Sequence, residues 1–186
     1  MHFYNEQIHL YQYIIIYILL KMYTWLIVFV ITNICTYIRN KYVQTDKISD
    51  IFDFVDCSEY KRACDMFPLI CLLCVSDYEK YFHCHTLLLL LRFICFNVTI
   101  IPPPMKLEIR YSFGVPNFQY DMIFSGHTMT CVLAIFCTSN IYSYYITMIM
   151  SILCSIGVII TKEHYTIDVI VAWVATHSIV CLVNNF

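Results

Sequence analysis

Two apolar runs of membrane-spanning length follow one another in the last third of the chain. They cover residues 144–160 and 166–183, and a short polar interval separates them. At 1.5 Å per residue, each would form a helix about as long as the ~30 Å hydrocarbon core of a bilayer is thick. Two such helices with so short a connection must run in opposite directions, which predicts a helical hairpin through a membrane.

Composition supports the same conclusion for the whole chain. Of its 186 residues, 60% are hydrophobic and 13% are charged, and the mean hydropathy is +0.69. A soluble domain is roughly half apolar and a quarter charged. The excess apolar surface needs a bilayer as its solvent, and a formal net charge of −2 offers no basic surface to nucleic acid. We therefore predict one transmembrane domain over residues 1–186.

Four further apolar segments bring the predicted number of spans to about six, in an all-α polytopic membrane bundle. They cover residues 22–38, 66–75, 86–101 and 122–138, and the second is so short that it must borrow flanking residues or be re-entrant. Between the spans we expect an amphipathic surface helix within 40–65, polar turns at 76–85 and 139–143, and a connecting loop at 105–120.

Eleven cysteines lie mostly inside apolar runs. This pattern is typical of buried free thiols, whereas a disulfide framework belongs to small secreted domains. Cys57 and Cys64 lie in the long polar segment, and the sequence leaves open whether they pair. The triplet His83-Cys84-His85 has adjacent side chains that point in different directions, so we predict no metal site there.

His164 and Asp168 lie four residues apart, where the last apolar run begins. On a helix this spacing puts both side chains on one face, with roughly 5–6 Å between their β-carbons. The carboxylate can accept a hydrogen bond from Nδ1 of the ring, which leaves Nε2 free to attack an electrophile. For this pair alone, an ordinary interfacial histidine beside a solvated aspartate is the simpler alternative.

Ser125, Gly126 and His127 open the run at 122–138. Serine can cap a helix start, glycine permits close approach of a ligand, and free N–H groups at a helix start attract anions. A capped helix with an interfacial histidine is the alternative. However, one span that descends from His127 and a second that returns bring His164 to the same membrane face. Two histidines and a carboxylate there suit metal-free phosphoryl transfer, with one histidine as nucleophile and the other as acid and then base.

Four stretches resemble, in order, the motifs of the sphingomyelin synthase family, a branch of the lipid phosphatase (PAP2-like) superfamily. Residues 121–128 (Asp-Met-Ile-Phe-Ser-Gly-His-Thr) are similar to its Asp-x-x-x-Ser-Gly-His-Thr motif, and residues 163–169 (Glu-His-Tyr-Thr-Ile-Asp-Val) to its second histidine motif. Residues 92–104 resemble its motif with arginine, threonine and prolines, and residues 46–54 loosely resemble the segment beside its first span. The resemblance is firm over about 92–174.

The resemblance implies a PAP2-like helix bundle and a head-group transferase. His164, oriented by Asp168, would attack the phosphorus of phosphatidylcholine or phosphatidylethanolamine, and His127 would protonate the departing diacylglycerol. His127 would then deprotonate the primary hydroxyl of ceramide, which takes the head group from the phospho-histidine. The substrate-binding residues carried over are Ser125, Gly126, Arg92, Glu163 and Asp121, and the resemblance implies neither a metal nor a cofactor.

Some features depart from the family pattern and keep other functions open. Lys162 stands where the family usually has a histidine, and the loop at 105–120 is shorter than usual. A lipid phosphate phosphatase of the same superfamily and a catalytically silent membrane protein are the alternatives. Lipid phosphatases usually have a Ser-Arg pair before their second histidine motif, which clamps a phosphomonoester, and this chain has no such pair there. The difference favours the transferase, because a phosphodiester needs less clamping. The resemblance implies a multi-pass protein of the Golgi or plasma membrane, and leaves head group and self-association undecided.

Overall fold

The computed structural model describes residues 23–24, 26–31, 34, 50, 57–98, 111–112, 115–116 and 123–185. Its helical elements are η1 (Ser58–Tyr60), α2 (Lys61–Cys64), α3 (Met66–Leu73), α4 (Tyr78–Val98), α5 (Gly126–Ile135), α6 (Ile141–Ile160) and α7 (Thr166–Asn184). Two short strands, β1 (Tyr111–Ser112) and β2 (Val115–Pro116), pair antiparallel, with Tyr111 opposite Pro116. Apart from this hairpin the described fold is helical, as the all-α prediction requires.

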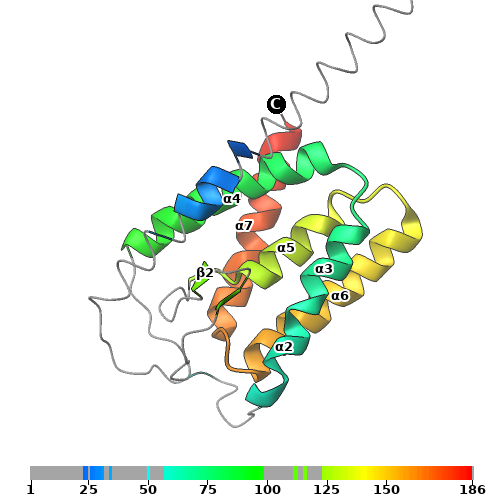
Figure 1. The fold of residues 1–186 in the computed structure, drawn as a ribbon. Helices are drawn as coiled ribbons and strands as arrows, with labels where there is room; N and C mark the ends of the chain where they lie inside the picture. Colours follow the sequence, from blue (N-terminus) through cyan, green and yellow to red (C-terminus); the bar gives the residue numbers. More distant parts are fainter. Residues whose placement is uncertain are drawn as a thin grey trace, which may run out of the picture.

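The helix α5 lies at the centre of the described bundle, between α3 and α7 (Figure 1). Seven of its ten residues are buried. It is shorter than the span expected at 122–138: at 1.5 Å per residue it reaches only about half-way across a bilayer core. The helix ends where Phe136 caps it, and the carbonyl of Cys137 then accepts the N–H groups of Ser76 and Asp77 at 3.0 Å each. These bonds tie the end of α5 to the turn between α3 and α4.

The two long apolar runs predicted near the end of the chain form α6 and α7, which the loop at 161–165 connects. Within the described part of the chain, these two helices are long and apolar enough to cross a membrane. Isoleucines at positions 149, 152 and 156 of α6 are about half exposed, whereas Ser151 is fully buried. An exposed apolar face opposite a small, polar, buried one is what a helix at a lipid boundary presents. The wider count of six spans stays a prediction.

Helix capping explains where α6 begins. The side chain of Asn140 accepts the N–H of Tyr142 at 2.8 Å and starts the helix at Ile141. Residues 141–143 therefore belong to α6, and the turn expected at 139–143 ends at Asn140. An N-cap asparagine satisfies a backbone donor that the first helical turn leaves open.

The helix α4 contradicts the polar turn expected at 76–85. The helix already begins at Tyr78. Asp77 marks this start, because its carboxylate accepts the N–H of Lys80 at 2.9 Å. No glycine or proline interrupts residues 78–98. Polarity does not by itself break a helix, and the polar residues after Asp77 lie on α4 and not in a turn.

Other predictions fall partly or wholly outside the described residues. Within the expected first span, the described positions 23–24, 26–31 and 34 are all helical. The eight-residue α3 is as short as its apolar segment suggested. Most of the amphipathic helix expected within 40–65, the prolines at 102–104, most of the loop at 105–120, and Asp121 lie outside the described residues.

The cysteines within the described residues are free thiols, including Cys57 and Cys64. The pairing of these two that the sequence left open is therefore not formed. Burial raises the pKa of Cys64 to about 11. Its thiol therefore stays protonated at neutral pH and packs as a small hydrophobic side chain.

Candidate active site

The loop between α6 and α7 presents the second histidine motif. The N–H of Lys162 donates to the carbonyl of Ile159 at 3.0 Å, and that of Glu163 to the carbonyl of Val158 at 2.9 Å. These bonds form a Schellman motif, which ends a helix and turns the chain sharply. Its left-handed position usually holds glycine, but here Lys162 occupies it with φ of 59°. The backbone at Lys162 is therefore strained, and the tight turn that it forms places His164 two residues before α7.

His164 and Asp168 face each other at the start of α7, as their spacing predicted. Both side chains are buried, with relative exposures of 8% and 1%. Nδ1 of His164 lies 3.6 Å from Oδ2 of Asp168, slightly beyond hydrogen-bonding distance. The same Oδ2 accepts the N–H of Tyr165 at 2.9 Å. Asp168 therefore caps α7 and at the same time turns its negative charge toward Nδ1, which leaves Nε2 as the ring nitrogen on the other side.

The first histidine motif starts α5 from a strained residue. Phe124 is fully buried and has φ of 138°, a value that side chains other than glycine rarely adopt. The hydroxyl of Ser125 then accepts the N–H of Thr128 at 3.3 Å and caps the helix. Phe124 and Lys162 are the two non-glycine residues with positive φ in the described part of the chain; Phe124 lies in the first motif directly before Ser125, and Lys162 directly precedes the second motif. Strain of this kind concentrates at functional sites.

Arg92 of α4 lies against the start of α5. A β-carbon added to Gly126 would stand only 2.7 Å from Nη1 of Arg92, so the guanidinium packs where any other side chain would be. Gly126 thus leaves room for a close approach, as the sequence predicted for a ligand, although here the approaching group is the side chain of Arg92. A guanidinium beside the N–H groups of a helix start can hold a phosphate.

A backbone hydrogen bond joins the two motifs. The N–H of Ser125 donates to the carbonyl of Asp168 at 3.4 Å. The start of α5 and the start of α7 therefore meet at one end of the bundle. His127 lies two residues after Ser125, and His164 four residues before Asp168, so both imidazoles belong to this end.

His127 has a partner that the sequence did not indicate. Its Nε2 lies 2.9 Å from Oδ1 of Asp65, the residue between α2 and α3. The side chain of His127 is 27% exposed and that of Asp65 54%. Burial lowers the pKa of His127, but the hydrogen bond to Asp65 and the negative charge of Glu163 outweigh it and raise the pKa above that of a free histidine. Asp65 therefore favours the protonated ring.

A second carboxylate that sequence reasoning missed supports the start of α7. Oδ2 of Asp50 accepts the N–H of Thr166 at 2.9 Å and its hydroxyl at 3.0 Å. Asp50 lies in the stretch 46–54, where only a loose resemblance pointed to a role. Both contacts join residues more than a hundred positions apart, and no pattern within a local window can reveal such pairs.

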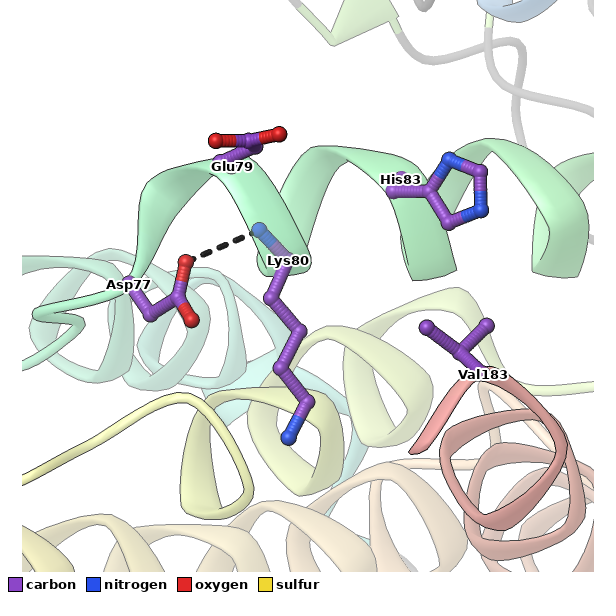
Figure 2. A pocket seen from close by; sticks show the side chains of 5 residues that line it. All are labelled: Asp77, Glu79, Lys80, His83 and Val183. Atoms are coloured by element: carbon purple, nitrogen blue, oxygen red, sulfur yellow. Dashed lines mark hydrogen bonds between the residues drawn. The ribbon is translucent and has the colours of Figure 1, made fainter. Parts of the chain in front are cut away.

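Two of the cavities in the described part of the chain differ in their relation to the site. One of about 330 Å³ is lined by Asp77, Glu79, Lys80 and His83 from the start of α4 and by Val183 from the last turn of α7 (Figure 2). Val183 is about 26 Å along α7 from its first residue, at 1.5 Å per residue, so this cavity is far from His164. The other, of about 280 Å³, is mostly apolar and adjoins Cys64 and Thr161. It lies beside the histidine end of the bundle.

Similarity to known proteins covers the same region. Residues 120–185 match the family described as PAP2 superfamily C-terminal. This segment contains His127, His164 and Asp168. It also contains Ser125, Gly126 and Glu163, whereas Arg92 lies outside it.

The chain is also similar to phosphatidylinositol:ceramide inositolphosphotransferase 3 of Arabidopsis thaliana. The two are 29% identical over an alignment 97 positions long, which covers 46% of this chain and 32% of that protein. This chain therefore aligns with about a third of the relative's length. Over this region the chain is thus similar to a PAP2 domain and to a ceramide head-group transferase, and its apolar composition and two long apolar helices indicate a membrane protein.

Proposed function

We propose that this protein transfers a phosphorylated head group from a glycerophospholipid to ceramide through a phospho-histidine at His164. The hydrogen bond between Ser125 and Asp168 is the observation that carries this proposal, because it brings the two histidine motifs to one end of the bundle. The similarity to a PAP2-type domain and to a ceramide head-group transferase supports the same chemistry.

In the first step, the lone pair of Nε2 on neutral His164 forms a bond to phosphorus. The bond between phosphorus and the diacylglycerol oxygen breaks, and protonated His127 gives its proton to that oxygen. The ring of His164 becomes positive, and the carboxylate of Asp168 beside Nδ1 stabilises this charge. Arg92 and the N–H groups at the start of α5 balance the negative charge on the phosphoryl oxygens.

In the second step, the primary hydroxyl of ceramide replaces the departed diacylglycerol. His127, now neutral, takes the hydroxyl proton while the oxygen bonds to phosphorus and the bond from phosphorus to Nε2 breaks. His164 returns to its neutral form and His127 to its protonated form, so the cycle closes without a cofactor.

The substrates are lipids whose reacting groups lie at the membrane surface. We propose phosphatidylcholine or phosphatidylethanolamine as donor, and the name of the plant relative, an inositolphosphotransferase, adds phosphatidylinositol to the set. The apolar cavity beside Cys64 and Thr161 is suited to an acyl chain of a bound lipid. The proposal includes a multi-pass protein of about six spans in the Golgi or plasma membrane, with Ser125, Gly126, Glu163 and Asp121 among the substrate-binding residues.

Hydrolysis of a lipid phosphate is the second candidate function. The side chain of His127 is 27% exposed, so water can reach the base that would activate an acceptor. A water molecule in place of ceramide would turn the same phospho-histidine intermediate into a phosphatase reaction.

One reconstitution experiment separates these functions. The full chain is purified from cells that cannot transfer head groups to ceramide and is placed in vesicles with fluorescent ceramide and one donor phospholipid at a time. A head-group-bearing ceramide product, formed together with diacylglycerol, supports the transferase. Release of the free phosphorylated head group, or of phosphate from phosphatidic acid, supports the phosphatase, and neither product from any donor would show that the chain is catalytically silent.

A matched pair of histidine variants makes the result specific. His164→Ala should abolish either product, because the nucleophile is lost. His83→Ala should retain it, because His83 is exposed in the cavity at the opposite end of the bundle (Figure 2). Equal activity of the two variants would remove His164 from the mechanism.

A further inference from the structure

We propose that Asp65 is a positioning residue for the general acid of this reaction: it holds the His127 ring with Nε2 toward the carboxylate and leaves Nδ1 to exchange the proton with the lipid. This inference rests on the proposed function and deepens it. It assigns a role to the segment between α2 and α3, which the matched region at 120–185 does not include.

A purely structural role for Asp65, as the cap of α3, is the alternative. Asp65 stands at the N-cap position of α3, where an aspartate commonly accepts an N–H of the first helical turn. The Asp65 side chain makes no such capping hydrogen bond. Its Oδ1 instead meets Nε2 of His127 at 2.9 Å, across 62 positions of sequence.

The stability of the fold does not depend much on this pair. The two side chains are 27% and 54% exposed, and ion pairs with such exposure contribute little to stability. A hydrogen bond of 2.9 Å nevertheless fixes the orientation of an imidazole and selects which nitrogen carries its proton. The consequence of the contact is therefore expected in catalysis.

His127 and His164 would then each pair with a carboxylate, but through different ring nitrogens. His164 turns Nδ1 toward Asp168 and has Nε2 available for phosphorus. His127 turns Nε2 toward Asp65 and has Nδ1 available for the leaving oxygen. In each pair the carboxylate stabilises the ring when it is positive, which is the state of His127 before the first step and of His164 after it.

Several other charged or titratable groups lie on the elements around the start of α5. They are Arg92 on α4, Cys154 on α6, Glu163 and His164 in the loop after α6, and Asp168 on α7. Among the acidic groups, Asp65 acts on His127 through a direct hydrogen bond and Glu163 through its charge. Removal of the Asp65 charge should therefore lower the pH at which His127 loses its proton.

The test measures diacylglycerol release from the active donor lipid, without ceramide, by the full chain in vesicles across a pH series. This first step needs protonated His127, so its rate falls as the pH rises through the pKa of that ring. In Asp65→Asn we expect this alkaline decline to begin at lower pH, with a rate at neutral pH reduced about 10- to 100-fold. That is part of the roughly 10²- to 10⁴-fold that general acid–base catalysis contributes.

Two further variants separate positioning from folding. Asp65→Glu keeps the charge and should hold the alkaline decline near its position in the unmodified chain. Glu59→Gln removes a nearby exposed carboxylate and should change neither the rate nor the pH profile. An Asp65→Asn profile that coincides with that of the unmodified chain would overturn the positioning role while the proposed function stands. Failure of the unmodified chain to release diacylglycerol from any donor would overturn both.

Discussion

Substitution of Asp168 by asparagine should separate the electrostatic role of this residue from its structural one. The carboxylate lies 3.6 Å from Nδ1 of His164, and Coulomb's law with an effective dielectric constant of about 20 gives roughly 4–5 kcal/mol for a full positive charge on that ring. The charge exists only after His164 has bonded to phosphorus. Its loss should therefore slow formation of the phospho-histidine by roughly 10³- to 10⁴-fold, since each 1.36 kcal/mol is a factor of ten.

The stability of the same variant should change little. Oδ2 of Asp168 accepts the N–H of Tyr165 at 2.9 Å, and the amide oxygen of asparagine can accept the same bond. Because this bond at the N3 position of α7 is kept, we expect the free energy of unfolding to fall by less than about 1 kcal/mol. Asp50→Asn is the matched control, because Asp50 also caps α7, through Thr166.

The assay is single-turnover labelling of the protein by a donor lipid with a radioactive head-group phosphate, with thermal unfolding in detergent measured in parallel. Slow labelling of Asp168→Asn with a near-normal unfolding temperature is the expected result, and Asp50→Asn should label at nearly the unmodified rate. Labelling of Asp168→Asn within threefold of the unmodified chain would refute the electrostatic argument.

Three other substitutions test single contacts. Ser125→Ala removes the cap of α5 and should lower the free energy of unfolding by about 1 kcal/mol, as measured by thermal unfolding, whereas an unchanged value would show that the cap contributes nothing. Gly126→Ala places a β-carbon 2.7 Å from Nη1 of Arg92, so the guanidinium must move. We expect the KM for the donor lipid to rise with little loss of stability. An unchanged KM would show that Arg92 takes no part in substrate binding. Gly157→Ala brings a β-carbon within 2.9 Å of Sγ of Cys64 and should lower the free energy of unfolding by about 1–3 kcal/mol. Adding Cys64→Ala removes the clash and should restore stability. A double variant that is no more stable than Gly157→Ala would disprove the clash.

The elements that sequence reasoning predicted well are those that local chemistry determines. The helices α6 and α7 follow from apolar runs of bilayer length, and the spacing of His164 and Asp168 follows from helical geometry. The cap at Ser125 is equally local, because hydroxyl and N–H lie three residues apart. In each case one short window of sequence contains all the interacting atoms.

The elements that sequence reasoning missed depend on distant residues or on atypical ones. Asp65, the partner of His127, lies 62 positions away in sequence. Its neighbouring residues mark it only as an ordinary acidic residue at a helix start. The polar residues at the start of α4 predict a turn, although Asp77 is a recognisable N-cap. Lys162 has a left-handed backbone conformation at a position where glycine is usual. Without a glycine there, the sequence does not predict the sharp turn that ends α6.

The central claim is that both imidazoles act on one phosphorus atom, with His164 as nucleophile and His127 as acid. The most direct measurement uses a nitrophenyl ester of the phosphorylated head group, whose leaving group needs no acid, and maps the labelled residue by mass spectrometry. The account predicts label on His164 in the unmodified chain and in His127→Ala, while His127→Ala fails with the natural lipid donor. Label on another residue, or equal loss of labelling with both donors in His127→Ala, would contradict it.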